Sequence, residues 1–199
     1  MTRAVVAVAV GLAASGCATT LESTSARTLA PGAYELTGAL GATTAALPDG
    51  DSSGALPLIA IGVRRGVADG VDVGAKLSPT GAQLDVKLQL RRADRGWSLA
   101  VAPGAGYLFP VLASVLTAEL PLLAGYTFAG GHELVLATTA TALIGPYDRA
   151  DFDVMLGGSV GFAWRMSARW KVMPEVTATR TVRDPVWGAG GGIALLRSL

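Results

Sequence analysis

The chain has 199 residues, a formal net charge of +1 and only 16% charged residues, where soluble domains typically carry about 25%. Removing Arg3, the single charged residue among the first 17, from the 16 basic residues leaves 15 against 15 acidic residues, which excludes the clustered basic excess of a nucleic-acid-binding protein. The mean hydropathy of +0.46 favours a protein with an apolar outer surface.

The first 17 residues predict an export signal. Arg3 gives a positively charged N-terminal region, residues 4–14 form an apolar run, and the run ends at Ser15, Gly16 and Cys17. This order is the pattern of a secretory signal peptide. The run is shorter than the roughly 20 apolar residues of a membrane-spanning helix. Cys17 is the single cysteine of the chain, so an exported form has no internal disulfide.

The end of this signal resembles the lipobox of bacterial lipoproteins, in which the cysteine becomes the first residue and carries lipid. Ser15, Gly16 and Cys17 match that pattern, whereas Ala14 stands where leucine is usual. The resemblance implies lipidation of Cys17 by lipoprotein-processing machinery. Ala18, in place of an aspartate, favours the outer membrane over the inner one. The alternative is ordinary cleavage after a small residue, with Cys17 lost or left as a free thiol.

Residues 18–32 are rich in serine, threonine and alanine and predict a flexible tether between a signal peptide over 1–17 and one domain over 33–199. In that domain polar and apolar residues alternate, most clearly over 83–90, as in a β-strand with one polar face. Glycine-containing turns separate such runs. We predict about ten strands, near 33–44, 55–65, 70–78, 81–92, 96–108, 114–128, 132–144, 152–166, 169–181 and 186–197.

Alternating segments of about ten residues joined by short turns are typical of outer-membrane β-barrels, because only a helix or a closed sheet satisfies every backbone group inside a bilayer. The chain resembles small outer-membrane β-barrel proteins of Gram-negative bacteria, and residues 169–176 are similar to late strands of such barrels. The resemblance implies an all-β, antiparallel up-and-down β-barrel of membrane type with about ten strands, eight being the alternative. It also implies outer-membrane lipid and barrel-assembly machinery as partners, and we expect a monomer.

Polar side chains of the alternating strands would point into the lumen of this barrel. With ten strands that lumen is small enough to be filled by side chains. The mixed signs of the charges predict an internal ion-pair network rather than an open pore or a substrate site. The predicted lumen-facing residues are Glu35, Asp72, Lys76, Asp85, Lys87, Glu119, Arg165, Lys171 and Glu175.

Two features predict irregular places in the wall. Pro103 and Pro121 fall inside predicted strands, where proline cannot donate to the ladder. They are equally far in sequence from Leu112, the expected tip of their hairpin, so we hypothesise that they face each other across a bulge or gap. The glycine-rich run 188–192 predicts close approach or strong bending where the barrel closes.

The sequence predicts no catalytic, cofactor-binding or metal-binding residue. The single histidine, His132, lies at a predicted periplasmic turn, and Glu133 beside it would point to the opposite face, so no triad is expected. Asp148, Asp151 and Asp153 lack the spacing of a calcium loop and predict a solvated loop.

Three hypotheses about function follow. The first is a non-enzymatic outer-membrane (lipo)protein, either structural or a narrow passage for small solutes. The second is a lipid-anchored soluble barrel or sandwich in the periplasm that binds an apolar ligand. The third is a barrel enzyme acting on lipid or peptide, a claim that would need at least the loss of any detected hydrolysis in His132→Ala.

Overall fold

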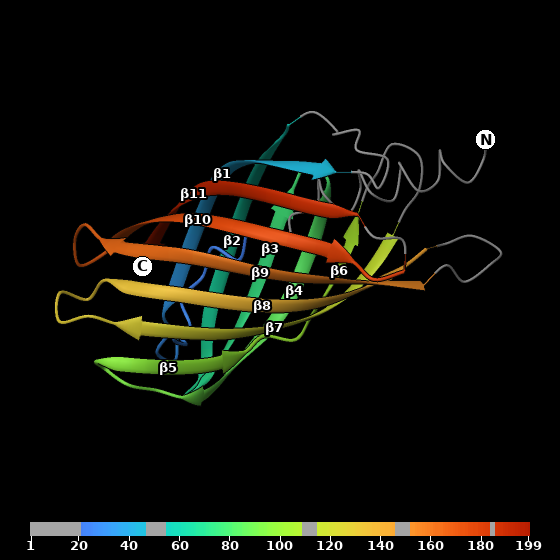
Figure 1. The fold of residues 1–199 in the computed structure, drawn as a ribbon. Coiled ribbons are helices and arrows are strands. Elements are labelled where there is room, and N and C mark those ends of the chain that lie inside the picture. The colour runs from blue at the N-terminus through green and yellow to red at the C-terminus, as the bar shows by residue number, and fades with distance from the viewer. Residues whose placement is uncertain (1–20, 47–54, 109–114, 146–151, 184–185) are drawn as a thin grey trace, which may run out of the picture.

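The computed structural model describes residues 21–46, 55–108, 115–145, 152–183 and 186–199 (Figure 1). Its regular structure consists of the strands β1 (Tyr34–Ala46), β2 (Leu56–Ala68), β3 (Val71–Ser78), β4 (Gly81–Arg91), β5 (Gly96–Val101), β6 (Gly104–Leu108), β7 (Val115–Thr127), β8 (Glu133–Ile144), β9 (Phe152–Arg165), β10 (Trp170–Thr181) and β11 (Trp187–Ser198). No helix in this part of the chain is long and apolar enough to cross a membrane.

The strands form a sheet that closes on itself. Successive strands from β1 to β4 and from β7 to β11 pair in antiparallel fashion, and β11 pairs with β1. Strands β5 and β6 follow one another along the same line, and both pair with β4 on one side and β7 on the other. Counted together as one strand, they give a closed antiparallel barrel of ten strands, which confirms the predicted fold class.

The break between β5 and β6 falls at Ala102 and Pro103. The residue pairs before and after the break keep the same register toward β4 and β7. The amide of Ala102 donates to the carbonyl of Pro121 at 3.0 Å, and the amide of Val86 donates to the carbonyl of Pro103 at 2.9 Å. The prolines therefore interrupt the ladder without shifting it. The predicted gap is therefore present, because the strand is interrupted at Ala102 and Pro103. The prediction that the two prolines face each other is wrong, because Ala102 rather than Pro103 lies opposite Pro121.

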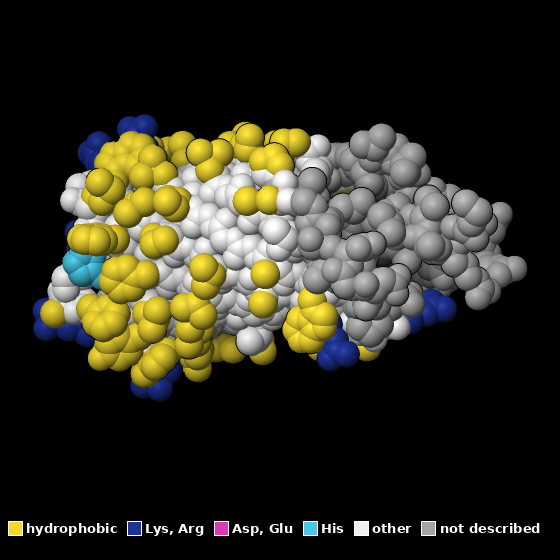
Figure 2. Space-filling view, turned by 45° about the horizontal axis from the view of Figure 1, so that its top comes forward, with side chains coloured by type: hydrophobic (Ala, Val, Ile, Leu, Met, Phe, Trp, Pro, Cys, Tyr) yellow, Lys and Arg dark blue, Asp and Glu magenta, His cyan; other side chains and the backbone are white. Residues whose placement is uncertain are grey.

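The two faces of the wall differ in polarity, as the alternation predicted. On β7 the side chains of Leu116, Leu120 and Leu122 are 54%, 49% and 51% exposed, whereas Thr117 and Glu119 are buried. Figure 2 shows one side of the barrel, where apolar side chains dominate, basic side chains lie at the rims and no acidic side chain is visible. A surface of this kind suits lipid outside and polar contacts inside.

The connections at the two ends of the barrel differ in length. At the end that carries Tyr34 and Ser198 they are residues 69–70, 92–95, 128–132 and 166–169. At the opposite end they include the longer segments 47–55, 109–114 and 145–151, beside the short turn 79–80. We call these the short-turn end and the long-loop end.

Aromatic side chains gather on the outside of the short-turn end. Trp97 and Tyr126 lie 5.4 Å apart between ring centroids, Tyr126 and Phe128 5.0 Å, and Phe128 and Phe162 6.1 Å. Such a row is typical of an interfacial girdle.

The first and last strands approach closely at a pair of glycines. Gly41 pairs with Gly192 across β1 and β11. A Cβ atom on Gly41 would lie 2.5 Å from the carbonyl oxygen of Gly191, and one on Gly192 would lie 2.5 Å from that of Leu40. The glycine-rich run therefore permits close contact at the seam, one of the two roles the sequence predicted for it.

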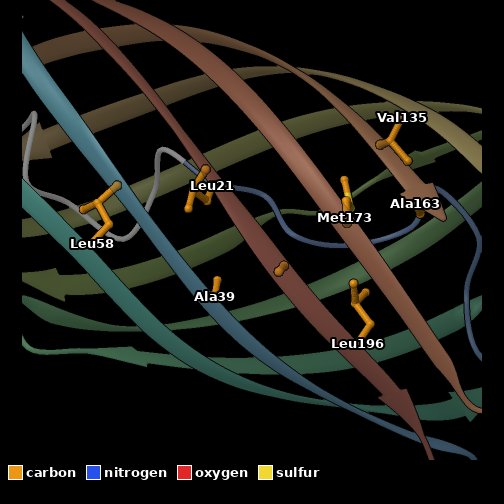
Figure 3. Packing of buried hydrophobic residues seen from close by; sticks show 8 residues of the cluster. Leu21, Ala39, Leu58, Val135, Ala163, Met173 and Leu196 are labelled. Atoms are coloured by element: carbon orange, nitrogen blue, oxygen red, sulfur yellow. The ribbon is translucent and has the colours of Figure 1, made fainter. Parts of the chain in front are cut away.

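The interior of the barrel contains its own N-terminal residues. Residues 21–29, which we call the lumen segment, are mostly buried, with Leu21 5% and Ala26 0% exposed. Leu21 belongs to a cluster of buried apolar residues that includes Leu58, Met173 and Leu196 (Figure 3). The sequence predicted a flexible tether over 18–32. The structure differs over 21–29, because this stretch is bonded to lumen side chains along its length.

Candidate functional site: a lumen occupied by the chain

Two glutamates of the wall bind backbone amides of the lumen segment. Glu175 accepts hydrogen bonds from the amides of Glu22 and Ser23, both at 3.0 Å. Glu133 accepts one from the amide of Ala26 at 3.1 Å and one from the hydroxyl of Ser25 at 2.6 Å. Both carboxylates are buried, and hydrogen bonds to a charged acceptor are roughly twice as strong as neutral ones.

Near the short-turn end, Asp72 and Gln89 hold the rest of the segment. The amide of Leu29 donates to Asp72 at 3.1 Å. The amide and hydroxyl of Thr28 donate to the Gln89 carbonyl oxygen at 2.7 and 3.1 Å. The Gln89 side-chain amide in turn donates to the carbonyl of Ala26 at 3.0 Å. Donors of this irregular stretch thus find the acceptors that a strand would find in a neighbouring strand.

Two lysines bind carbonyl and hydroxyl oxygens of the segment. Lys76 Nζ donates to the carbonyl of Leu21 at 2.8 Å. Lys87 Nζ donates to the carbonyl of Ser25 at 2.9 Å and to the hydroxyl of Thr24 at 3.2 Å. Lys87 is only 1% exposed, so these oxygens replace the water that its ammonium group has lost.

A group of four charged side chains lies on β2, β3 and β4 beside the segment. Arg64 contacts Asp72 at 2.6 Å and Asp85 at 2.7 Å, and Lys87 lies 3.6 Å from Asp72. The two cations and two carboxylates balance one another. Buried charges are tolerated when they are paired in this way.

The structure places the nine predicted lumen residues as follows. Glu35, Asp72, Lys87, Glu119 and Glu175 are buried, Lys76, Asp85 and Lys171 are half-buried, and Arg165 is exposed at the short-turn rim. Asp72, Lys76, Lys87 and Glu175 contact the lumen segment directly. Glu119 instead accepts hydrogen bonds from two wall residues, Gln83 at 2.6 Å and Thr117 at 3.4 Å.

Sequence reasoning missed Arg64, Gln89, Glu133 and the lumen segment itself. Arg64 had an available signal, because Ile61 and Val63 mark the outer face of their strand and the alternation then turns Arg64 inward and Arg65 outward. The lumen segment had none, since its bonds depend on backbone amides that look alike in any sequence.

Two small cavities lie beside the segment. A cavity of about 30 Å³ lies among Leu21, Glu22, Arg64 and Lys76, and another of about 30 Å³ lies between Leu21 and Leu58. Each volume suits about one water molecule. In the described residues the lumen is therefore occupied at the level of Leu21 and below it.

The residues that the sequence analysis considered for catalysis, metal binding or lipidation either lie away from the lumen segment or fall outside the described residues. His132 lies at the short-turn end, where its Nδ1 accepts a bond from the amide of Arg165 at 3.1 Å and its ring stacks near Phe162 at 6.2 Å. Among the described residues no three His, Cys, Asp or Glu side chains are grouped as metal ligands. Asp148, Asp151 and Cys17 lie outside the described residues.

The fold and the apolar exterior define the chain as an outer-membrane-type β-barrel. It is similar to an outer membrane channel from Pseudomonas putida F1, with a TM-score of 0.60 at 10% identity over 87% of this chain and 97% of that one. It also matches the outer membrane protease OmpT from Escherichia coli (TM-score 0.49, 9% identity, 88% and 100% covered) and Ail, the attachment invasion locus protein of Yersinia pestis (0.38, 8%, 85% and 99%).

These identities establish the fold alone, because one fold carries many functions. No protein-family model matches the chain. No curated protein matches it either.

Proposed function

We propose that this protein is a non-enzymatic outer-membrane β-barrel whose lumen is closed by its own residues 21–29, and that small solutes pass only when these residues leave. The observation that carries the proposal is a set of hydrogen bonds: amides of the lumen segment donate to Glu133, Glu175 and Asp72, and Lys76 and Lys87 donate to its carbonyls. A purely structural barrel could fill its interior with wall side chains. Here a separate, non-strand piece of chain fills it instead.

The outer surface supports a membrane location over a soluble periplasmic domain. Large apolar side chains such as Leu40, Leu84 and Val176 are more than 60% exposed on the barrel wall. In water such a contiguous surface would promote aggregation, whereas in a bilayer it is the lipid contact surface. A Cys17→Ser chain tests this choice: a spanning barrel still requires detergent for extraction, and a tethered soluble domain is released without it.

Planar-bilayer conductance tests the closed lumen. The full chain is expected to insert and remain mostly silent, and a chain lacking residues 21–29 is expected to give stepwise current, because the cavities left beside the segment admit about one water each. Equal current from both chains would contradict closure by the segment. Silence from both, with heat-modifiable gel migration proving that both are folded, would contradict the passage and support a structural role.

A point-variant pair tests the same proposal without a deletion. Glu133→Gln with Glu175→Gln replaces two charged acceptors by neutral amides, and each lost charge-assisted bond is worth about 1.5–3 kcal/mol. The double variant is expected to open far more often than the parent. Glu119→Gln is the matched control, since Glu119 is also buried in the lumen but bonds Gln83 rather than the segment; it should leave the open fraction unchanged.

We also propose that Cys17 carries lipid, on the strength of its lipobox-like context. Mass spectrometry of the purified chain tests this directly. The expected result is a diacylglyceryl-modified N-terminal peptide beginning at Cys17, which Cys17→Ser would abolish. A peptide beginning elsewhere would support ordinary signal cleavage.

A further inference from the structure

A hollow opens on the outside of the barrel near its long-loop end. It has a volume of about 440 Å³, and its lining includes Leu156, Gly157, Ala178, Arg180, Val182 and Trp187. We call it the outer groove. It lies on strands β9 and β10 and at the start of β11, on the side of the wall opposite to the lumen.

The groove exists because small residues separate large ones on this part of the wall. Ala178 pairs with Gly158, and Thr179 pairs with Gly157, so β9 and β10 carry almost no outward bulk there. Leu156 and Trp187, 51% and 56% exposed, stand on either side. The floor of the outer groove thus lies close to the backbone of β9 and β10, and the side chains on its two sides are apolar.

Arg180 brings a positive charge to the edge of this apolar hollow. It pairs with Leu156 on β9 and with Trp187 on β11, and its guanidinium carbon lies 5.1 Å from the centre of the Trp187 ring. Ala178 and Val182, the residues next to Arg180 on the outward face of its strand, carry no charge. Within the described part of the chain no carboxylate lies at ion-pair distance from Arg180.

A guanidinium group beside an apolar hollow fits a lipid with an anionic head. Arginine binds phosphate with two parallel hydrogen bonds, and tryptophan is favoured at the level of lipid headgroups. In the orientation expected for such barrels, the short-turn end faces the periplasm and the long-loop end faces outward. The groove then lies at the outer-leaflet headgroup level.

We propose that the outer groove binds a phosphorylated lipid of the outer leaflet, with an acyl chain in the hollow and a phosphate on Arg180. This rests on the membrane location given under Proposed function and is independent of the lumen segment. The charge on Arg180 and the apolar lining together select such a lipid: a free phosphate would leave the hollow unfilled, and an uncharged lipid would leave Arg180 without an ion-pair partner among the described residues.

The test measures retention of bis-phosphorylated lipid A by the full chain in detergent micelles, using native mass spectrometry and titration. Arg180→Gln is expected to lower the affinity about tenfold or more, as for loss of a charge-assisted hydrogen bond. Ala178→Phe keeps the charge and fills the hollow, and it should weaken binding as well. Lipid A stripped of both phosphates should bind the parent and Arg180→Gln equally.

Arg197→Gln is the matched control. The guanidinium carbon of Arg197 lies 5.2 Å from the centre of the Trp170 ring, close to the 5.1 Å between Arg180 and Trp187, but Arg197 lies at the short-turn end. Heat-modifiable migration of each variant confirms that the barrel has folded. Unchanged affinity in Arg180→Gln, an equal loss in Arg197→Gln, or full displacement of the lipid by inorganic phosphate would overturn the proposal while leaving the barrel itself established.

Discussion

Arg64 forms ion pairs with two carboxylates in the lumen, and its removal would leave their negative charges incompletely neutralised. It contacts Asp72 at 2.6 Å and Asp85 at 2.7 Å, and breaking a buried ion pair costs about 3–5 kcal/mol. We therefore expect Arg64→Met to lower the free energy of unfolding by about that amount. Urea titration in detergent micelles, followed by tryptophan fluorescence, measures it.

The neighbouring residue supplies the control for this prediction. Arg65 lies on the opposite face of the same strand, with its guanidinium carbon 5.3 Å from the Tyr34 ring centre. An exposed cation–π contact is worth about 0.5–1 kcal/mol, so Arg65→Met should cost no more than that. Equal losses of unfolding free energy in the two variants would show that the ion pairs of Arg64 stabilise the barrel no more than the exposed contact of Arg65 does.

At the scale of elements, the seam between β1 and β11 depends on its glycines. Gly192→Ala would place a Cβ atom 2.5 Å from the carbonyl oxygen of Leu40 and 2.8 Å from the Leu21 side chain. The strands must then separate, and overpacking of this kind costs about 1–3 kcal/mol. We expect the urea midpoint of Gly192→Ala to fall accordingly.

Gly38 in the same pair of strands provides the contrast. A Cβ atom on Gly38 would meet nothing within 4 Å, and alanine is favoured over glycine in a strand interior by about 0.5–1 kcal/mol. Gly38→Ala should therefore leave stability unchanged or raise it slightly. A fall as large as that of Gly192→Ala would show that strand flexibility, rather than close approach, explains the glycines.

The strands were predictable because the pleat fixes which side each residue faces. The predicted strands 81–92 and 114–128 correspond to β4 (Gly81–Arg91) and β7 (Val115–Thr127), since their polar and apolar residues alternate with period two. The split of 96–108 into β5 and β6 was only hinted at by Pro103. Propensity alone could not show that Ala102 and its neighbours keep their register through backbone bonds.

The lumen segment was not predictable for a different physical reason. Ser23, Thr24 and Ser25 have no periodicity, and short polar residues of this kind are as common in linkers as in packed loops. The partners of the segment lie far away in sequence, at Glu133 and Glu175. The glutamates were visible in the sequence, but the amides that they bind were not.

At the scale of the whole molecule, the occupied lumen and the lipid proposed for Cys17 constrain each other. A lipid on Cys17 would be joined to Leu21 by four residues of chain, which span at most about 14 Å. Leu21 packs near Gly192. Gly192 is six residues from Ser198, which places it about 15 Å above the short-turn end for a strand tilted by about 40°. Residues 22–29 fill the lumen below Leu21. A route through the lumen from Cys17 to the periplasmic leaflet would have to pass these residues.

We accordingly expect the chain anchored by Cys17 in the periplasmic leaflet to have its lumen segment withdrawn. Thr139 faces the lumen and donates to Glu22 at 2.8 Å, so Thr139→Cys reports on the segment through its reaction with a small maleimide. It should react in the lipidated chain and be protected in the same chain with Cys17→Ser. Asp69→Cys is the control for reagent access, because Asp69 lies in the turn 69–70 at the short-turn end with its side chain 91% exposed. Equal protection of Thr139→Cys in both chains, with lipid on Cys17 confirmed by mass, would show that the lipid and the occupied lumen coexist. A difference would make acylation of Cys17 the event that sets whether the barrel is open.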